Sequence, residues 1–207
     1  MHITLLDTGS GNIPNVIRAL EYVGATVQRV ASPEAWRDRA APVVLPGVGH
    51  FGSVMGAIRA HGLVQAVTEV LREGQAPFLG ICVGLQALFE RSAESGVDAG
   101  LGLLSGAVQD LRASAQLQPG AKVPHMGWNE VEPLGSDSLL RERGYAYFVH
   151  RYYVPGDHPA CIARSTYAGV SIAAAVRVRE RAWAVQFHPE KSGAYGLALL
   201  RRFVESA

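Results

Sequence analysis

The sequence predicts an α/β fold with a central, mostly parallel sheet and an antiparallel extension in its C-terminal half. Strand-like and helix-like segments alternate up to residue 82, and this order places strands parallel with helices on both faces. In the second half the segments become short and β-rich, with few helices between them, which indicates antiparallel pairing. A chain of 207 residues, 48% of them hydrophobic, can bury one full core, so we expect a single domain over residues 1–207.

The first elements of the chain predict strands and a helix in turn. Short apolar or alternating runs predict strands over residues 3–6, 26–30 and 42–45. A turn over residues 9–12 leads from the first strand into a helix whose first turn accommodates Pro14. The apolar residues of this helix share one face: Ile13, Val16, Ile17 and Leu20.

The remaining elements follow from capping and periodicity. Ser32 is an expected N-cap for a short helix through Trp36. A loop over residues 46–52 precedes expected helices over 54–60 and 64–72, and the next strand ends at Cys82. Short strands are then expected over residues 108–111, 130–131, 145–149, 161–165, 171–176 and 182–186. A closing helix carries Leu197, Leu200 and Val204 at helical spacing.

Cys82 is the candidate nucleophile of the chain. It stands between Gly80 and Gly84, after an apolar strand-like run and before the helix-like residues 85–89. A glycine two residues either side of a nucleophile, where a strand turns sharply into a helix, is the elbow that exposes a reactive side chain. The N-terminus of the following helix would favour a thiolate. Taken alone, the elbow is equally compatible with a small cysteine buried in the core.

A base and a group to orient it follow far downstream. His188 and Glu190 flank Pro189 directly after a strand-like segment. Because proline cannot continue a helix and lacks an N–H, we expect both side chains on a rigid loop at a strand end. A catalytic cysteine needs such partners close in space rather than in sequence. Together with the elbow, this pattern favours a Cys-His-Glu triad over a structural cysteine.

The glycine-rich loop after the third strand admits two interpretations. Residues 47–52 match the G-x-G-x-x-G pattern of dinucleotide-binding folds. That pattern belongs to the first βαβ unit, with an acidic residue ending the next strand, whereas here the next strand ends in Cys82, so nicotinamide and flavin binding are disfavoured. Attack on a carbonyl instead creates an oxyanion that backbone N–H groups stabilise. We expect these donors at Val83, Val48 and Gly49.

Charge and cysteine usage narrow the class of protein. The formal net charge of +1 favours neither nucleic acid nor a membrane surface as a partner. The first residues lack a basic flank with a long apolar stretch, and no run approaches the length of a membrane span. A disulfide between Cys82 and Cys161 would block the nucleophile and is not expected. We therefore expect a cytoplasmic protein without metal or cofactor, in which Cys161 is inert core.

Five motifs, in this order, resemble those of the class I glutamine amidotransferases and, within that class, the HisH family of imidazole glycerol phosphate synthase glutaminase subunits. They are Pro-Gly-Val-Gly-His-Phe from residue 46, Gly-Ile-Cys-Val-Gly-Leu-Gln from 80, Pro-His-Met-Gly-Trp-Asn from 124, Tyr-Phe-Val-His from 147 and Gln-Phe-His-Pro-Glu-Lys-Ser-Gly from 186. The elbow and the His-Pro-Glu sequence indicate only the class, whereas the third motif and Lys191 indicate the subunit. The resemblance covers essentially the whole chain and implies a flavodoxin-like three-layer fold and a role in histidine biosynthesis.

The resemblance also implies roles for individual residues. Cys82 would attack the side-chain amide of glutamine and form a glutamyl thioester, His188 would carry the proton, and Glu190 would orient His188. Side-chain and backbone groups of four residues would hold the substrate: Gly49, Gln86, Arg151 and Tyr152. Gln86 lies one turn after Cys82 on the same helix face, although a solvent-exposed helix residue would explain its position as well.

The implied partner is a second enzyme. Ammonia released into solvent would be protonated and diluted, so the chemistry favours delivery into another active site. In the family that site belongs to a HisF-type (β/α)₈ barrel cyclase, which forms a heterodimer with the glutaminase and makes imidazole glycerol phosphate and an aminoimidazole ribonucleotide. Residues that match interface positions are Trp128, Asn129, Tyr147 and Lys191. On composition alone, Trp128 would be assigned to the core and Lys191 to an ordinary surface charge, but a tryptophan is a common anchor at interface centres and Lys191 directly follows the candidate triad residue Glu190.

Three positions depart from the family pattern. Thr8 stands where a tyrosine is usual, residues 13–15 read Ile-Pro-Asn in place of a commoner Leu-Arg-Ser, and Arg151 replaces a small hydroxyl residue. The first two departures could alter how the oxyanion loop is held. The third argues against a contact of the family type between the side chain of residue 151 and the substrate, whereas a contact through its backbone would remain possible. Two alternatives stay open: the glutaminase of pyridoxal phosphate synthesis, whose early Gly-Gly-Glu-Ser stretch is absent here, and a catalytically silent subunit that only binds a barrel.

Overall fold

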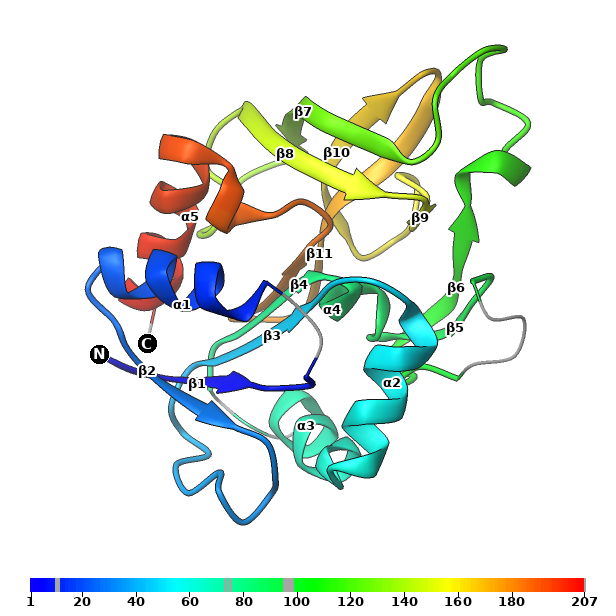
Figure 1. Cartoon of the computed structure of the whole chain (residues 1–207). Helices are drawn as coiled ribbons and strands as arrows, with labels where there is room; N and C mark the ends of the chain where they lie inside the picture. Colours follow the sequence, from blue (N-terminus) through cyan, green and yellow to red (C-terminus); the bar gives the residue numbers. More distant parts are fainter. Residues whose placement is uncertain (10–11, 73, 75, 95–98, 207) are drawn as a thin grey trace.

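The computed structural model describes residues 1–9, 12–72, 74, 76–94 and 99–206. A large sheet forms the centre of the molecule, and helices cover both faces of its parallel half (Figure 1). Within the described residues this sheet has nine strands in the order β2-β1-β3-β4-β12-β11-β10-β7-β8. The expected turn over residues 9–12 includes residues 10 and 11, which lie outside the described part of the chain. The predicted α/β class is confirmed.

The parallel half of the sheet positions the candidate nucleophile. It consists of β2 (Thr26–Val30), β1 (His2–Leu6), β3 (Val43–Gly47), β4 (Phe78–Cys82) and β12 (Ala182–Val185). Every residue of β3, β4 and β12 is buried, as a parallel sheet with helices on both faces requires. Gly47 at the end of β3 pairs with Cys82 at the end of β4. The glycine-rich loop therefore starts beside the elbow.

The second half of the chain extends this sheet with antiparallel strands, as the sequence predicts. These strands are β11 (Val170–Arg179), β10 (Cys161–Tyr167), β7 (His125–Pro133) and β8 (Gly144–His150). Figure 1 shows β7, β8 and β10 at the top of the view, beyond the helices that cover the parallel half. This extension carries two of the five family-like motifs, so it also takes part in building the site.

Two pairs of helices cover the parallel strands from opposite sides. Helices α1 (Ile13–Tyr22) and α5 (Gly193–Glu205) contact each other on one face, and α2 (Phe51–Ala60) and α3 (Leu63–Arg72) contact each other on the other (Figure 1). Pro14 lies in the first turn of α1, and the helix buries one apolar stripe against the sheet. The predicted helices at these positions are confirmed.

Several local predictions were wrong. Residues 32–36 form turns rather than a helix, and Ser32 Oγ accepts a hydrogen bond from Ala35 N at 3.3 Å within them. This segment buries Trp36 alone and so lacks the apolar stripe that stabilises a short helix. The loop expected over residues 46–52 is shorter, because Pro46 and Gly47 extend β3 and Phe51 begins α2.

The helix that follows the elbow is also shorter than its sequence suggests. Helix α4 spans only Val83–Gln86, and residues 89–92 leave it to form β5 (Phe89–Ser92). This strand pairs with β6 (Leu104–Asp110), which also pairs with β9 (Tyr152–Tyr153), in a separate three-stranded sheet. The expected strand over residues 108–111 thus belongs to a small sheet that sequence periodicity did not reveal.

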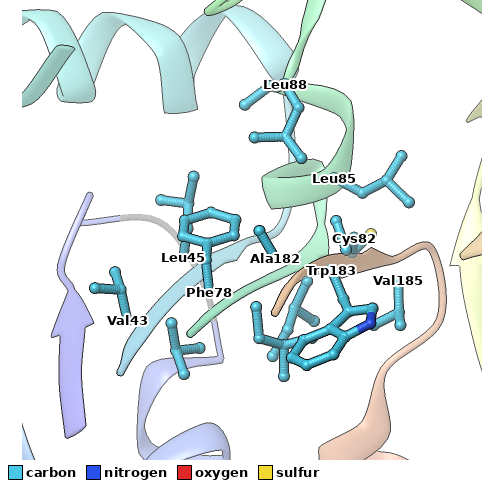
Figure 2. Close-up of a cluster of buried hydrophobic side chains, with 14 of the residues drawn as sticks. Val43, Leu45, Phe78, Cys82, Leu85, Leu88, Ala182, Trp183 and Val185 are labelled. Atoms are coloured by element: carbon cyan, nitrogen blue, oxygen red, sulfur yellow. The ribbon is translucent and has the colours of Figure 1, made fainter. Parts of the chain in front are cut away.

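The core beneath the elbow is continuous and apolar. Figure 2 shows side chains from β3, β4 and β12, with Cys82 at the upper end of β4 near Leu85. Trp183 is 2% exposed and Phe78 is fully buried. Close packing of this kind leaves side chains few alternative positions, so the elbow stands on a rigid base.

Arg179, at the end of β11, holds the C-terminal end of α3. Its guanidinium donates to the carbonyl oxygens of Leu71 at 3.1 Å, Val70 at 3.0 Å and Ala76 at 2.8 Å. The last carbonyls of a helix have no partners within the helix. We expect Arg179→Met to lower the free energy of unfolding by about 2 kcal/mol, because buried acceptors lose their donor. Urea denaturation measures this loss.

A surface arginine provides the matched control for this variant. Arg143 pairs with Glu130 and Glu132, and all three side chains are largely exposed. Exposed ion pairs contribute little to stability, so Arg143→Met should change the free energy of unfolding by less than about 0.5 kcal/mol. Equal losses in the two variants would mean that Arg179 acts only as a surface charge.

Candidate active site

Cys82 ends β4 in the strained conformation that an elbow requires. Its φ is 54° and its ψ is −105°, a region that residues other than glycine rarely occupy and that recurs at functional sites. Helix α4 begins at the next residue. A Cβ on Gly84 would lie 2.0 Å from the carbonyl oxygen of Leu45, so only glycine allows the elbow to approach β3 this closely. The predicted strand-to-helix elbow is confirmed.

His188 and Glu190 form a buried pair on the loop that follows β12. His188 Nδ1 lies 2.9 Å from Glu190 Oε1, and both side chains are 1% exposed. Because a carboxylate accepts, Nδ1 carries the proton of this bond. Within the described residues, His188 Nε2 is buried without a hydrogen-bond partner. This leaves Nε2 as the nitrogen that can exchange a proton in the site.

The charge state of His188 depends on its neighbours. Burial disfavours the charged imidazole, but the interactions with Cys82 and with the Glu190 carboxylate outweigh this and raise the pKa of His188 above its usual range. A protonated imidazole beside an anionic sulfur is the ion pair that cysteine hydrolases use. The geometry is thus suited to acyl transfer.

The nucleophile and the imidazole open into one cavity of about 640 Å³. Predicted site residues that line it are Cys82, Val83, Val48, Gly49, Gln86, Arg151, Tyr152, His188 and Lys191. Glu190 lies behind His188, bonded to Nδ1. Further lining residues, for which the sequence predicts no role, are Asn12, His50, Glu94, Pro124, Val149 and His150. The structure therefore brings together residues from both ends of the chain.

The expected oxyanion donors lie on two sides of the same elbow. Val48 and Gly49 follow β3, whose last residue pairs with Cys82, and Val83 begins α4. Gly49 has a φ of 87°, and no atom lies within 4 Å of the place where its Cβ would stand. The positive φ explains why glycine occupies this position. Both backbone segments border the cavity.

Gln86 is buried, not an exposed helix residue. It is 3% exposed, and its Nε2 donates to the carbonyl oxygen of Tyr152 at 3.0 Å and to Gln186 Oε1 at 3.2 Å. Gln186 Nε2 in turn lies 3.6 Å from Cys82 Sγ. The amide of Gln186 therefore contacts the candidate nucleophile. Gln186 lies two residues before His188 in the sequence, and nothing in that position predicts this contact.

Two charged residues on the cavity wall are held by neighbours. The Arg151 guanidinium bonds to Asp110 with Nε and Oδ1 2.9 Å apart, and this bond lowers the pKa of Asp110. Glu94 Oε2 accepts from the backbone N–H of Phe51, at the start of α2, at 2.5 Å. The sequence around Glu94 contains no motif. Its position on the cavity wall depends on the path that the chain takes through β5.

His125 and His150 form a neutral pair at the cavity, whose wall includes His150. His125 Nδ1 and His150 Nε2 are 3.0 Å apart, and His150 Nδ1 lies 2.9 Å from the carbonyl oxygen of Tyr152. A carbonyl only accepts, so His150 Nδ1 carries a hydrogen and Nε2 accepts from His125. Burial lowers the pKa of His125 to about 4. Burial and the proximity of His125 lower the pKa of His150 to about 3.

This neutral pair predicts a pH dependence of stability. In the unfolded chain a histidine has a pKa of about 6.5, so below that pH the unfolded state binds protons that the folded pair excludes. The stabilisation is complete above pH 6.5 and decreases as the pH falls, by up to about 1.4 kcal/mol per pH unit for each histidine.

We expect the doubly substituted His125→Gln/His150→Gln chain to show a flatter slope of the free energy of unfolding against pH, measured by urea denaturation between pH 6.5 and pH 4.5. His2→Gln, at an exposed position, should keep the wild-type slope. An unchanged slope in the double variant would contradict the assignment.

An exposed surface beside the site carries two aromatic residues, an apolar side chain and a cation. We call it the Trp128 face, and it consists of Met126, Trp128, Tyr147 and Lys191. Met126 is 61% and Trp128 57% exposed, so Trp128 is not a core residue. Its ring meets Tyr147 edge to face, and Lys191 Nζ lies 5.7 Å from the centre of the Tyr147 ring. Asn129 points to the other side of β7 and donates to the carbonyl oxygen of Thr166 at 2.9 Å.

Both cysteines are free, as the sequence predicts. Cys161 is only partly buried, rather than fully in the core, and that burial raises the pKa of its thiol, which disfavours the nucleophilic thiolate. Among the helices that the structure describes, none combines the length and the apolar character needed to cross a membrane.

Comparisons with known proteins agree with this geometry. Residues 4–207 match the family model described as glutamine amidotransferase class-I. "Imidazole glycerol phosphate synthase subunit HisH" of Deinococcus radiodurans is 47% identical over 97% of this chain and 92% of its own length. The subunit of the same name is 44% identical in Herpetosiphon aurantiacus, over 99% of this chain and 94% of its own length. That of Bacillus subtilis is 41% identical, over 99% and 96%.

Solved structures show the same fold at lower identity. The crystal structure of a glutamine amidotransferase superposes with a TM-score of 0.74 at 20% identity, covering 98% of this chain and 97% of that one. PurLQS from Thermotoga maritima gives a TM-score of 0.73 at 19% identity, covering 99% and 98%. The chain therefore belongs to the class-I glutamine amidotransferases and, among them, to the HisH subunits of imidazole glycerol phosphate synthase.

Proposed function

We propose that Cys82, His188 and Glu190 carry out the glutamine hydrolysis of this family. The Cys82 thiolate attacks the Cδ of the glutamine side chain, and His188 Nε2 gives its proton to the leaving ammonia. The neutral imidazole then takes a proton from water, which attacks the thioester and releases glutamate, and the thiolate–imidazolium pair returns. The observation that carries this proposal is the buried His188–Glu190 pair at 2.9 Å, on the cavity that Cys82 lines.

The cavity wall offers a group for each part of the substrate. Backbone N–H groups of Val83, Val48 and Gly49 would stabilise the tetrahedral oxyanion. Gln86 uses Nε2 for Tyr152 and Gln186, which leaves its Oε1 to accept from the substrate. Glu94 is the one carboxylate among the described lining residues and would pair with the α-ammonium group. The backbone of Arg151 and Tyr152 would hold the remaining polar end.

We further propose that the Trp128 face binds a HisF-type (β/α)₈ barrel cyclase in a cytoplasmic heterodimer. The HisH relatives carry the name of a synthase subunit, and the Trp128 face combines exposed apolar side chains with a cation, as interface centres often do. Lys191 belongs to this face and also lines the cavity, so ammonia would leave the site directly under the partner. Asn129 lies on the opposite face of the same strand as Trp128 and would contribute to the interface from there.

Ammonia release from glutamine tests the proposed function. It is measured with the purified chain alone, with the cyclase, and with the cyclase and its ligand. We expect glutamine-dependent formation of imidazole glycerol phosphate in the complete system. A chain that binds the barrel but releases no ammonia under any of these conditions would instead be a catalytically silent subunit.

Trp128 should contribute strongly to binding of the cyclase. We expect Trp128→Ala to weaken the complex by about 2 kcal/mol, roughly 30-fold, because a central aromatic side chain buries a large area. Titration calorimetry measures the dissociation constant. Tyr22→Ala is the matched control, since Tyr22 is 73% exposed at the end of α1 and should leave affinity unchanged. Equal affinities of the two variants would place the interface elsewhere.

A further inference from the structure

A continuous chain of hydrogen bonds runs from β7 to the sulfur of Cys82. We call it the buried hydrogen-bond chain, and its members in order are Asn129, His125, His150, Tyr152, Gln86, Gln186 and Cys82. Gln186 is fully buried, and the two histidines are no more than 6% exposed. Water therefore has little access to replace a lost partner, and each bond in the series constrains the next.

The carbonyl oxygen of Tyr152 fixes the direction of every bond. A carbonyl only accepts, so both His150 Nδ1 and Gln86 Nε2 must donate to it. Gln86 Nε2 also donates to Gln186 Oε1 at 3.2 Å. With its oxygen turned to Gln86, the Gln186 amide must present its NH₂ group to Cys82 Sγ, 3.6 Å away. The nucleophile therefore faces a donor and not an amide oxygen.

We propose that Gln186 stabilises the Cys82 thiolate by donating to it, and that Gln86, Tyr152 and His150 are positioning residues that hold its amide in this orientation. The proposal rests on the hydrolytic role of Cys82 given above. A hydrogen bond to an ionised group is stronger than one between neutral groups. An amide turned by half a rotation would direct its oxygen at the anion and destabilise it.

The short length of α4 limits what the helix itself contributes to a thiolate. The helix has only four residues, so its macrodipole is much smaller than that of the longer helix the sequence suggested. Its contribution to a thiolate is correspondingly small. Among the described residues, the amide of Gln186 is the polar side chain whose hydrogen bond reaches the sulfur, with Nε2 and Sγ 3.6 Å apart.

Alkylation of Cys82 by iodoacetamide at pH 7 tests the proposal independently of glutamine turnover. The rate is followed in the complex with the cyclase by mass spectrometry of the peptides, which separates Cys82 from Cys161.

Gln186→Met removes the donor at similar volume, and we expect it to slow alkylation about tenfold. Gln186→Glu places a carboxylate beside the thiolate and should slow alkylation of Cys82 further. This variant also tests the proposal if the methionine variant does not fold. In the methionine variant kcat should fall while KM for glutamine changes little. A wild-type alkylation rate in a folded Gln186 variant would overturn the proposal.

Two substitutions of His150 separate positioning from packing. Asparagine places its NH₂ group near the position of Nδ1 and keeps the donation to Tyr152, whereas glutamine places its amide near Nε2 and loses it. We expect His150→Gln to slow alkylation of Cys82 more than His150→Asn, and equal rates would overturn the positioning role. If this order holds but the wild-type complex does not hydrolyse glutamine, the proposed function fails and the assignment of Gln186 stands.

Discussion

Replacing Cys82 by alanine is expected to abolish the release of ammonia from glutamine, by a factor of at least about 10⁴ in kcat. In the proposed mechanism the sulfur provides the covalent step, and neither the His188 imidazole nor a water molecule can substitute for it. Coupled measurement of glutamate formation in the complex with the cyclase gives the residual rate. Because the thiol is small and the elbow stands on a packed core, the fold should remain intact.

Two controls show that this loss is chemical. The Cys82→Ala chain should bind the cyclase with wild-type affinity. The complex should still make imidazole glycerol phosphate when ammonium salts replace glutamine, since only the ammonia source is removed. Residual glutamine hydrolysis near the wild-type level would contradict the role of Cys82, and loss of binding would show that the variant is misfolded.

Glu190→Gln is expected to lower kcat for glutamine hydrolysis by up to about 10⁴, the loss that follows removal of the orienting carboxylate in other triads. The carboxylate helps to raise the pKa of His188, so its removal lowers that pKa. The imidazole then loses its proton at a lower pH, and the alkaline limb of the pH–rate profile should move to lower pH. Profiles of kcat/KM between pH 6 and pH 10 measure this shift.

An exposed carboxylate provides the comparison for Glu190. Glu142 pairs with Arg202 and is 62% exposed, so Glu142→Gln should leave both the rate and the profile unchanged. An alkaline limb that stays in place in Glu190→Gln would show that the carboxylate does not act on the imidazole. A shift towards higher pH would contradict the electrostatic argument directly.

The parallel half of the fold was predictable because its signals are local. Strands such as β3 and β4 are buried on both faces, which makes them continuous apolar runs between turn residues. The elbow and the His-Pro-Glu sequence are likewise short motifs, and they indicated Cys82, His188 and Glu190 as the candidate triad. Helix and strand positions followed from the same periodicity, with errors of a few residues at the ends.

What sequence could not reveal depends on contacts between distant residues. Phe89 leaves the helical pattern because β5 pairs with β6, and Glu94 reaches α2 only through that excursion. The contact of Gln186 with Cys82 depends on β12 lying beside β4. Such pairings have no periodicity of their own, so local patterns alone cannot predict them.

Gly84 serves the path of the backbone and takes no part in bond cleavage, because its missing side chain lets the turn lie against Leu45. A descendant that had lost its thiol and kept only the docking role would still need hydrogen at this position. In such a chain the close approach of the turn to β3 would still require this glycine, whereas the side chains of the proposed triad would be free to change.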